Sequence, residues 1–523
     1  MHDEIFLILN VHFFDIKHAM IILDSVLNWW IKKRIHQIEL FIKYPHDVQG
    51  DLFKKLISTA KDTEWGKKYD YKSINSADEY RERVPLSSYE DLKPHIDKMR
   101  KGEQNILWPE EITWFAKSSG TTGSKSKFIP VSPSALEECH YKGGKDLLAI
   151  YLNLHPDSGF FEGKSLVMGG SWNITEINNI SYMKGDLSAI LMHNLPLWAQ
   201  YKRTPSLSIA LMDEWENKLE LMAESTLDHD VTSISGVPSW MLVLLRKILK
   251  KAGKSDLSEV WPNLEVFFHG GVNFEPYRAQ FQLMISSPKM VYSDNYNASE
   301  GFFGIQDQSD SNELLLMLDY GIWYEFLPAS DMMNENGKTL LLHEVKTGVN
   351  YAIVISTNAG LWRYLIGDTV MFTNTNPYRI RITGRLKNFI NAVGEELIID
   401  NAEKAMITAC TKTGALVGEY TAGPLFSGHD VSHQWLIEFE IPPKDMEFFH
   451  ETFDNALKSL NSDYEAKRYH NLVLKPPVIE VMPQGTFYNW MKSRNKLGGQ
   501  NKVPRLANDR KYLDEILTLQ GTF

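Results

Sequence analysis

Cysteine is nearly absent from this sequence, which holds only Cys139 and Cys410. Two cysteines cannot build a disulfide framework, and they are too few for a zinc cluster made of thiolates. Such scarce use of cysteine fits a reducing compartment, so we expect a cytoplasmic protein.

An excess of positive charge is also lacking. Lysine and arginine total 55 against 66 aspartate and glutamate residues, which gives a formal net charge of −11 and a pI of about 5.8. Binding nucleic acid through its phosphates requires a basic surface, so we expect no nucleic-acid partner.

Long hydrophobic runs are missing as well. Residues 5–22 are apolar in places, but polar and charged side chains interrupt them before the ~18–20 residues of a membrane span are reached. Asp3 and Glu4 stand where a secretory signal would be basic. We expect no membrane span. Because a more regular helical pattern opens at Met20, we also expect residues 1–19 to be an over-extended start.

Repeats, low-complexity segments and long Gly/Ser linkers are absent, whereas 43% of the 523 residues are hydrophobic. A chain of this length is expected to form two or more domains with substantial cores. Residues 21–44 carry apolar side chains at helical spacing and are predicted to form an amphipathic helix. Its basic edge would suit a membrane surface, but a helix docked on its own domain is the preferred interpretation.

From about residue 160 onward, short apolar runs that end in glycine or polar residues alternate with longer helical patterns. The predicted strands are 165–168, 231–235, 264–268 and 290–293, and the helices between them include 238–251 and 274–285. This alternation indicates an α/β sheet. Ligands of such sheets bind beyond the carboxyl ends of the strands, so the residues that follow each strand are the first candidates for a site.

Between about 313 and 383 the pattern changes to successive short strands. They are predicted at 314–318, 323–327, 338–343, 351–356, 369–372 and 379–383. A smaller segment then holds a predicted strand at 434–441 and a helix at 444–460. The predicted fold is a large N-terminal α/β domain (1–386) with a β-rich, barrel-like subdomain, followed by a small mobile α+β domain (387–523).

The strongest local signal is the polar segment 117–127, KSSGTTGSKSK. Its glycines let backbone N–H groups approach phosphate oxygens, and its hydroxyl groups and lysines add donors and positive charge. Gly120 and Gly123 are too close together for the Walker pattern GxxxxGK[ST]. A phosphate-binding loop is the preferred interpretation, and a flexible polar surface loop is the alternative.

Four motifs occur in the order of the adenylate-forming superfamily, which this sequence resembles. Segment 118–125 resembles that superfamily's phosphate loop, and 296–300 (YNASE) resembles its Tyr-Gly-x-Ser/Thr-Glu motif. Segment 362–368 (WRYLIGD) is similar to Tyr-Arg-x-Gly-Asp with a longer spacer, and 384–390 (GRLKNFI) is similar to the hinge motif. Each motif is weak alone, but four in order are specific.

Finer details resemble one branch, the plant auxin- and jasmonate-conjugating acyl-acid amido synthetases, known as the Gretchen Hagen family. These details are the residues that make up the second motif (296–300) and the third motif (362–368), together with the late segment 499–505 (GQNKVPR). Segment 235–241 (SGVPSWM) is similar to bacterial relatives of that family. The sequence departs at Leu365, where the plant pattern usually has a basic residue, and it shows no recognisable auxin or jasmonate pocket.

The resemblance implies ATP and Mg²⁺ as cofactors. The residues that would cradle the triphosphate are Ser118, Ser119, Gly120, Thr121, Thr122 and Gly123. Gly270 and Gly271, at a strand end, would let the base approach the backbone, although an ordinary β–α turn is the alternative. Tyr296, beside Ser299, would stack on adenine.

Charged residues complete the implied nucleotide site. Glu300 would hold Mg²⁺, a hard cation that prefers oxygen ligands. Asp368 would accept both ribose hydroxyls, a task for a two-oxygen acceptor. Arg385 would reach ribose or phosphate. Solvated surface or turn positions are the alternatives for all three.

Lys502 is the candidate for the late catalytic lysine of the superfamily. Attack of a carboxylate on the α-phosphate brings two anions together, and a positioned cation stabilises the charge that builds up. Lys496 is the competitor, but the frame Gly-Gln-x-Lys-x-Pro-Arg surrounds Lys502 and favours it.

The remaining candidates are weaker. Trp172, Ser239, Trp240 and Met241 are guesses for the substrate site, chiefly an apolar acyl pocket, with core packing as the alternative for the apolar ones. A metal site is rejected for the group formed by His429, Asp430 and His433, because a third convincing ligand is missing.

The function implied by the resemblance is an ATP-dependent ligase. It would activate a small carboxylic acid as acyl-AMP and transfer the acyl group to an amine, an amino acid in the preferred interpretation. An acyl-CoA or carrier-protein ligase is the first alternative, and a non-catalytic homologue that binds nucleotide or acid is the second. The sequence names neither acid nor acceptor, and it leaves the oligomeric state open.

Overall fold

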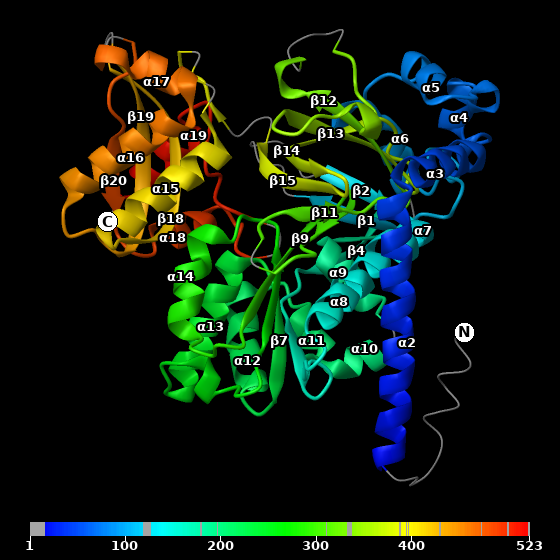
Figure 1. Cartoon of the computed structure of the whole chain (residues 1–523), viewed down its shortest axis with the longest axis horizontal. Helices are drawn as coiled ribbons and strands as arrows, with labels where there is room; N and C mark the ends of the chain where they lie inside the picture. Colours follow the sequence, from blue (N-terminus) through cyan, green and yellow to red (C-terminus); the bar gives the residue numbers. More distant parts are fainter. Residues whose placement is uncertain are drawn as a thin grey trace.

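The computed structural model describes residues 16–118, 127–177, 180–195, 197–309, 311–331, 337–385, 389–393, 395, 397–427, 430–471, 473–498 and 501–520. Figure 1 shows a large body that contains the N-terminal helices and a broad sheet, and beside it a smaller C-terminal unit. Within these ranges no helix combines the length and apolar character needed to cross a membrane.

Helices dominate the first part of the chain. They are α2 (Ile16–Lys43), α3 (Pro45–Ala60), α4 (Glu64–Lys68), α5 (Ala77–Arg83) and α6 (Tyr89–Arg100). Helix α2 confirms the helix predicted at 21–44. Ile38 and Phe41 on its C-terminal half are buried, and Arg34 forms an ion pair with Asp146 of α8 (Lys142–Leu154). This half of α2 is therefore docked on the body.

One eleven-stranded sheet forms the centre of the body. Its α/β part contains β6 (Arg203–Thr204), β3 (Lys164–Val167), β7 (Val231–Gly236), β8 (Val266–Gly270) and β9 (Val291–Ala298), which are neighbours in that order and parallel. The strands predicted at 165–168, 231–235, 264–268 and 290–293 are thereby confirmed as β3, β7, β8 and β9.

Helices cover both faces of these parallel strands. On one face lies α8, and on the other lie α12 (Trp215–Thr226), α13 (Pro238–Ala252) and α14 (Glu275–Met284). The chain between β3 and α12 also forms α9 (Leu187–His193), α10 (Leu197–Lys202) and α11 (Leu207–Ala210). Phe267 of β8 packs on Phe281 of α14, whereas its neighbour Phe268 packs on Tyr151 of α8. Successive strand residues point to opposite faces, so a strand covered on both sides reads as a continuous apolar run.

The β-rich segment continues the same sheet in antiparallel fashion. Beyond β9 lie β10 (Gly301–Ile305), β11 (Leu314–Leu316), β15 (Tyr378–Arg385), β14 (Tyr364–Thr375), β13 (Asn350–Thr357) and β12 (Ile322–Pro328). Five of the six strands predicted between 313 and 383 are present. They extend the large sheet and do not form a sheet of their own.

The strand predicted at 338–343 is wrong. This segment makes only an isolated bridge between Leu340 and Phe326, followed by a 3₁₀ turn at Leu342–Glu344. Leu340 exchanges two backbone hydrogen bonds with Phe326, at 2.8 and 2.7 Å. Side chains bind the groups on either side of it: Arg81 donates to the Thr339 carbonyl, and the Leu341 N–H donates to the Glu344 carboxylate. These bonds take the place of a strand ladder, which the apolar pattern could not reveal.

A small second sheet lies beside the large one. It contains β2 (Lys127–Val131), β1 (Trp114–Ser118), β5 (Ile180–Gly185) and β4 (Trp172–Ile177), in that order. The described helix turn α7 (Pro133–Ala135) and a π-helix at Leu136–Tyr141 lead from β2 into α8.

The C-terminal unit has its own three-stranded sheet, in the order β18 (Leu416–Ser427), β19 (Asp430–Ile441) and β20 (Val478–Met482). Two short strands, β16 (Phe389–Ile390) and β17 (Leu397–Ile398), precede it, and its helices are α15 (Ile399–Thr413), α16 (Met446–Leu460), α17 (Ser462–Arg468), α18 (Thr486–Ser493) and α19 (Lys511–Gln520). The strand predicted at 434–441 and the helix predicted at 444–460 are confirmed. In Figure 1 this unit lies against α14.

Candidate active site

The Gly270-Gly271 pair lies where the carboxyl ends of β8 and β9 meet. Gly270 is in register with Asn295 of β9, and a Cβ atom on Gly270 would lie 2.5 Å from the Asn295 carbonyl oxygen. No larger residue fits there without displacing β9. The predicted place of this pair at a strand end is confirmed, and its part in a site stays a prediction.

Lys502 reaches this glycine turn from the C-terminal unit. Its ammonium group donates a hydrogen bond to the Gly271 carbonyl oxygen. Gly271 has a φ of +81°, which favours glycine, and a Cβ atom there would lie 3.0 Å from the Lys502 Nζ. The Lys502 ammonium group therefore lies where a side chain at position 271 would begin. The fold thus brings together two predicted site residues that are far apart in sequence.

Neighbouring contacts fix the segment that carries Lys502. The Trp240 indole N–H donates to the Asn501 carbonyl at 2.8 Å, and the Thr421 hydroxyl donates to the Pro504 carbonyl at 2.6 Å. Arg505 donates to the Tyr277 hydroxyl of α14 at 2.6 Å. The frame around Lys502 is therefore held by both units, which the sequence did not reveal.

Lys496, the competing lysine, has a different environment. It is half-buried, and burial lowers its pKa, with smaller contributions from Arg494 and Lys511. Lys117, at the start of the predicted phosphate loop, also acts on it electrostatically. Among the described residues, the contact with the Gly271 carbonyl is recorded for Lys502 and not for Lys496.

Tyr296 and Asp368 meet from two distant strands. The Tyr296 hydroxyl of β9 donates to Asp368 Oδ2 of β14 at 2.7 Å, and both side chains are buried. One side of the Tyr296 ring contacts Phe303, with centroids 4.8 Å apart. A carboxylate can accept several hydrogen bonds at once, so this bond orients Asp368 without exhausting its capacity.

The turn after β9 carries Ser299 and Glu300. Ser299 is buried, and Glu300 is partly exposed at the same end of the strand as Gly270. Arg385 is paired in backbone register with Asp368 across β14 and β15. The predicted nucleotide-binding positions are thus clustered around one end of the sheet, while their individual roles stay predictions.

The predicted phosphate loop falls almost wholly outside the described residues. Ser119, Gly120, Thr121, Thr122 and Gly123 belong to the range that is not described. Its flanks are described: Ser118 ends β1, Lys127 begins β2, and the two are register partners. The Lys127 ammonium donates to the Tyr364 hydroxyl at 3.3 Å, which links this hairpin to the strand that carries Asp368.

Sequence reasoning gave Arg363 no role, and the structure shows a structural one. Arg363 is buried with a φ of +43°, and its guanidinium forms a two-pronged ion pair with Glu325 at 3.0 and 2.8 Å. It also donates to the carbonyls of Arg81 and Val84 at 2.7 Å. These bonds anchor the start of β14, five residues before Asp368.

The substrate guesses lie in mixed surroundings. Met241 is fully buried in the core between α12 and α13, and Trp240 packs on Trp215 with centroids 4.9 Å apart. Trp172 is half-buried in an aromatic group with Trp114 and His193. Ser239 is partly exposed at the start of α13. Their roles in a pocket stay predictions.

The rejected metal group has a structural explanation. The buried His433 Nε2 lies 2.7 Å from the buried Glu395 carboxylate, which also accepts backbone N–H bonds from Ala392 and Val393. His429 lies outside the described residues. In the described part of the chain, no group of three or more potential ligands is arranged to hold a metal ion.

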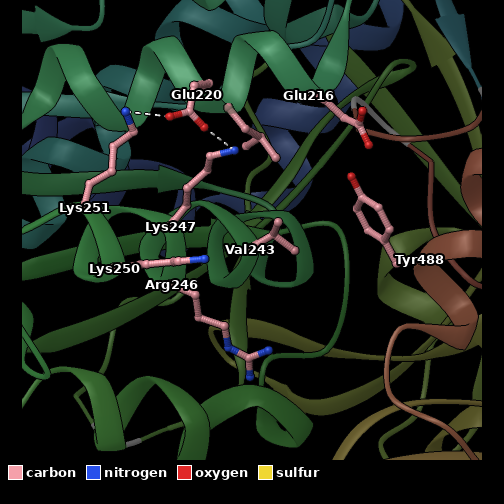
Figure 2. A pocket seen from close by; sticks show the side chains of 9 residues that line it. Glu216, Glu220, Val243, Arg246, Lys247, Lys250, Lys251 and Tyr488 are labelled. Atoms are coloured by element: carbon pink, nitrogen blue, oxygen red, sulfur yellow. Dashed lines mark ion pairs between the residues drawn. The ribbon is translucent and has the colours of Figure 1, made fainter. Parts of the chain in front are cut away.

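An open cavity of about 710 Å³ lies away from these residues, between α12, α13 and α18 (Figure 2). Lys247 and Lys251 both form ion pairs with Glu220, whose single negative charge offsets one of their two positive charges. Its described lining is Glu216, Leu219, Glu220, Val243, Arg246, Lys247, Lys250, Lys251 and Tyr488, none of which was predicted as a site residue.

Comparisons with known proteins show the family. Three family models match the chain: the GH3 family N-terminal domain over residues 34–290, the central domain over 315–385 and the C-terminal domain over 400–511. Among curated proteins, the indole-3-acetic acid-amido synthetase GH3.3 of Arabidopsis thaliana is 24% identical, covering 91% of this chain and 92% of its own. The 4-substituted benzoates-glutamate ligase GH3.12 of the same plant is 23% identical, with 94% and 97% covered.

Solved structures show the same fold. AtGH3.15 acyl acid amido synthetase in complex with 2,4-DB superposes with a TM-score of 0.78 at 17% identity, covering 93% of this chain and 96% of its own. A 2-hydroxyisobutyryl-CoA ligase in the postadenylation state superposes with a TM-score of 0.57 at 12% identity, with 91% and 92% covered.

Proposed function

This chain belongs to the GH3 family, and on that premise we propose that it is an ATP-dependent acid–amino acid ligase of the adenylate-forming kind. It would activate a small carboxylic acid as acyl-AMP and join the acyl group to the amine of an amino acid. The observation that carries the proposal is the contact between Lys502 and the Gly271 carbonyl, beside the strand ends that position Tyr296 and Asp368.

In the first step a carboxylate oxygen would attack the α-phosphorus of ATP. A new P–O bond forms to the acid, the bond to the β-phosphate oxygen breaks, and pyrophosphate leaves. Negative charge is concentrated because two anions react, so a cation held at this point lowers the barrier. Lys502 is the cation that the chain holds over the end of β8.

The nucleotide would bind along the sheet edge. Tyr296 offers a ring against which adenine can stack, and Asp368, oriented by the Tyr296 hydroxyl, can accept the ribose hydroxyls. Glu300, at the turn after β9, offers the oxygen ligands that Mg²⁺ prefers, and the ion would neutralise phosphate charge when bound. Residues 118–123 would hold the phosphates, and Arg385 would add a positive charge.

In the second step the amine nitrogen would attack the acyl carbon. A C–N bond forms, the bond from the acyl carbon to the phosphate oxygen breaks, AMP leaves, and the amine gives up a proton. This step needs no cation at the α-phosphate of the kind required in the first. We therefore propose that the unit after residue 386 rotates about 385–387 between the steps and withdraws Lys502.

We place the reaction in the cytoplasm. Cys139 is buried, Cys410 is partly buried, and neither forms a disulfide. Unpaired thiols are typical of a reducing compartment.

Two measurements test the proposed function. Pyrophosphate release from ATP with a panel of carboxylic acids asks whether the chain activates an acid, and Asp368→Ala serves as the matched control. Adding amino acids or CoA in turn then identifies the acceptor. Amide formation with an amino acid supports the proposal, and a thioester with CoA replaces it by the acyl-CoA ligase. No pyrophosphate with any acid favours a binding protein.

A further inference from the structure

A buried carboxyl lies at the boundary between the two units. Glu403 of α15 is only 6% exposed, and its Oε2 accepts a hydrogen bond from the Asn273 side-chain amide at 2.6 Å. Asn273 belongs to the turn between β8 and α14, two residues after Gly271. The bond therefore joins the C-terminal unit to the turn whose carbonyl accepts the Lys502 hydrogen bond.

The second neighbour of this carboxyl is the guanidinium of Arg505. Arg505 stabilises the charged form of Glu403 electrostatically, and it donates to the Tyr277 hydroxyl at 2.6 Å and to the Tyr420 carbonyl at 3.3 Å. It follows Lys502 by three residues on the same described segment. Glu403 is thus hydrogen-bonded to the turn that carries Gly271 and interacts electrostatically with the segment that carries Lys502.

We propose that Glu403 is a positioning residue that holds the Gly271 turn and the Lys502 segment in register for acyl-AMP formation. It touches neither reacting group and acts through Asn273 and Arg505. The inference rests on the proposed function, since the register matters only if Lys502 serves the first step. Rotation of the C-terminal unit would break the Glu403–Asn273 bond, so this contact also links that motion to the ionisation of one carboxyl.

The charged groups around Glu403 determine whether its ionisation strengthens or weakens the contact between the two units. The pKa of Glu403 is raised to about 7, because burial and, to a lesser extent, Asp400 on the same helix raise it by more than Arg505 and the Asn273 bond lower it. Tyr277 and Tyr420 also face this site, and burial raises the pKa of both phenols, so both are neutral near pH 7. Glu419 forms an ion pair with Arg505 and shares its charge.

When Lys502 contacts Gly271, Glu403 therefore keeps its proton at pH values at which a solvated carboxyl would release it. Below a pH of about 4.5 the carboxyl is protonated whether or not the interface is formed, and pH has no effect. Between about 4.5 and 7 the separated arrangement gains stability as its carboxyl ionises, and above about 7 this advantage is constant. Rising pH through this window thus weakens the registered arrangement.

Glu403→Gln provides the test, because glutamine retains an oxygen that can accept the Asn273 bond and has no ionisation. If acyl-AMP formation follows the registered population, the ratio of the Glu403→Gln rate to the wild-type rate rises about 10-fold between pH 6 and pH 8. A merely structural role would lower the rate by one factor at every pH. Glu216→Gln is the matched control, because Glu216 pairs with Lys492 across the same two units but is about half exposed. Its ratio should stay constant.

Hydrogen exchange separates this inference from the proposed function. In Glu403→Ala, backbone amides in 272–274 and 501–506 should exchange faster than in wild type, while those of β7 stay unchanged. The positioning role is overturned if the ratio of the Glu403→Gln rate to the wild-type rate does not change with pH and the backbone amides of Glu403→Ala exchange at the wild-type rate. If wild type releases no pyrophosphate with any acid but the exchange difference is present, the proposed function fails and the contact between the units stands.

Discussion

Replacing Lys502 by alanine removes the one cation that the described chain places on the Gly271 carbonyl. The side chain is partly exposed and its segment is held by separate bonds through Trp240 and Arg505, so we expect the fold to survive. The rate of acyl-AMP formation should fall, because this is the half-reaction in which charge builds up on the α-phosphate. Binding of ATP should change little, because we propose that it relies on Tyr296 and Asp368, which are hydrogen-bonded to each other.

The expected size of the effect follows from the nature of the contact. Removing a well-placed donor or cation from a transition state costs ~10²–10³ in rate, or ~2.7–4 kcal/mol of barrier. Lys502→Ala should therefore slow acyl-AMP formation by this factor. Given chemically synthesised acyl-AMP, the same variant should transfer the acyl group to its amine at close to the wild-type rate, because the carbonyl is already activated.

Lys496→Ala is the control for this experiment. Lys496 lies six residues earlier, is half-buried and has no recorded contact with the Gly271 carbonyl, so both half-reactions should proceed as in wild type. Pyrophosphate release reports the first half-reaction, and AMP release from synthetic acyl-AMP reports the second. Normal acyl-AMP formation by Lys502→Ala, or the defect appearing in Lys496→Ala instead, would refute the placement of the catalytic lysine.

Three further predictions test other parts of the site. Glu300→Gln should weaken Mg²⁺-dependent pyrophosphate exchange, and Asp368→Ala should weaken ATP binding, both with an unchanged unfolding midpoint. A variant whose pyrophosphate exchange equals that of wild type would show that the substituted residue is not part of the site. Arg363→Met should lower the free energy of unfolding in urea by ~3–5 kcal/mol, because it leaves the Glu325 carboxylate buried without its partner, and a loss below 1 kcal/mol would contradict this. Lys387→Pro would fix φ near −65° at the proposed pivot, so one half-reaction should fail while the other survives; two unchanged rates would move the pivot elsewhere.

The sequence predicted the α/β part of the fold well because periodicity reports burial. Strand β8 is packed on both faces, so it appears as the apolar run 266–268 followed by His269 and Gly270. Strands β3, β7 and β9 contain polar residues and were found from short apolar stretches followed by glycine or polar residues. The same reasoning placed Gly270 and Gly271 correctly at a strand end. The sequence was therefore sufficient to predict the order of these elements and the position of the glycine pair at a strand end.

Periodicity failed where side chains replace the backbone ladder. Residues 338–343 have an apolar pattern suited to a strand, but only Leu340 pairs with β12, and the side chains of Arg81 and Glu344 bind the backbone groups on either side of it. Arg363 was equally invisible, because its partner Glu325 lies in another strand and nothing local marks either residue as buried. Contacts between residues far apart in sequence leave no periodic trace in one chain.

The pairing of Tyr296 with Asp368 shows how the fold brings candidate site residues together. A parallel sheet alone would end at β9, and its crevice would contain the glycine turn and Tyr296 but no acceptor from beyond residue 305. Because β10, β11, β15 and β14 continue the same sheet in antiparallel order, Asp368 of β14 returns to within 2.7 Å of the Tyr296 hydroxyl. The C-terminal unit then adds Lys502 from a third direction. Each group needed for the proposed adenylation is thus supplied by a different part of the chain, and a change in the register of any one part should impair the first half-reaction more than the fold.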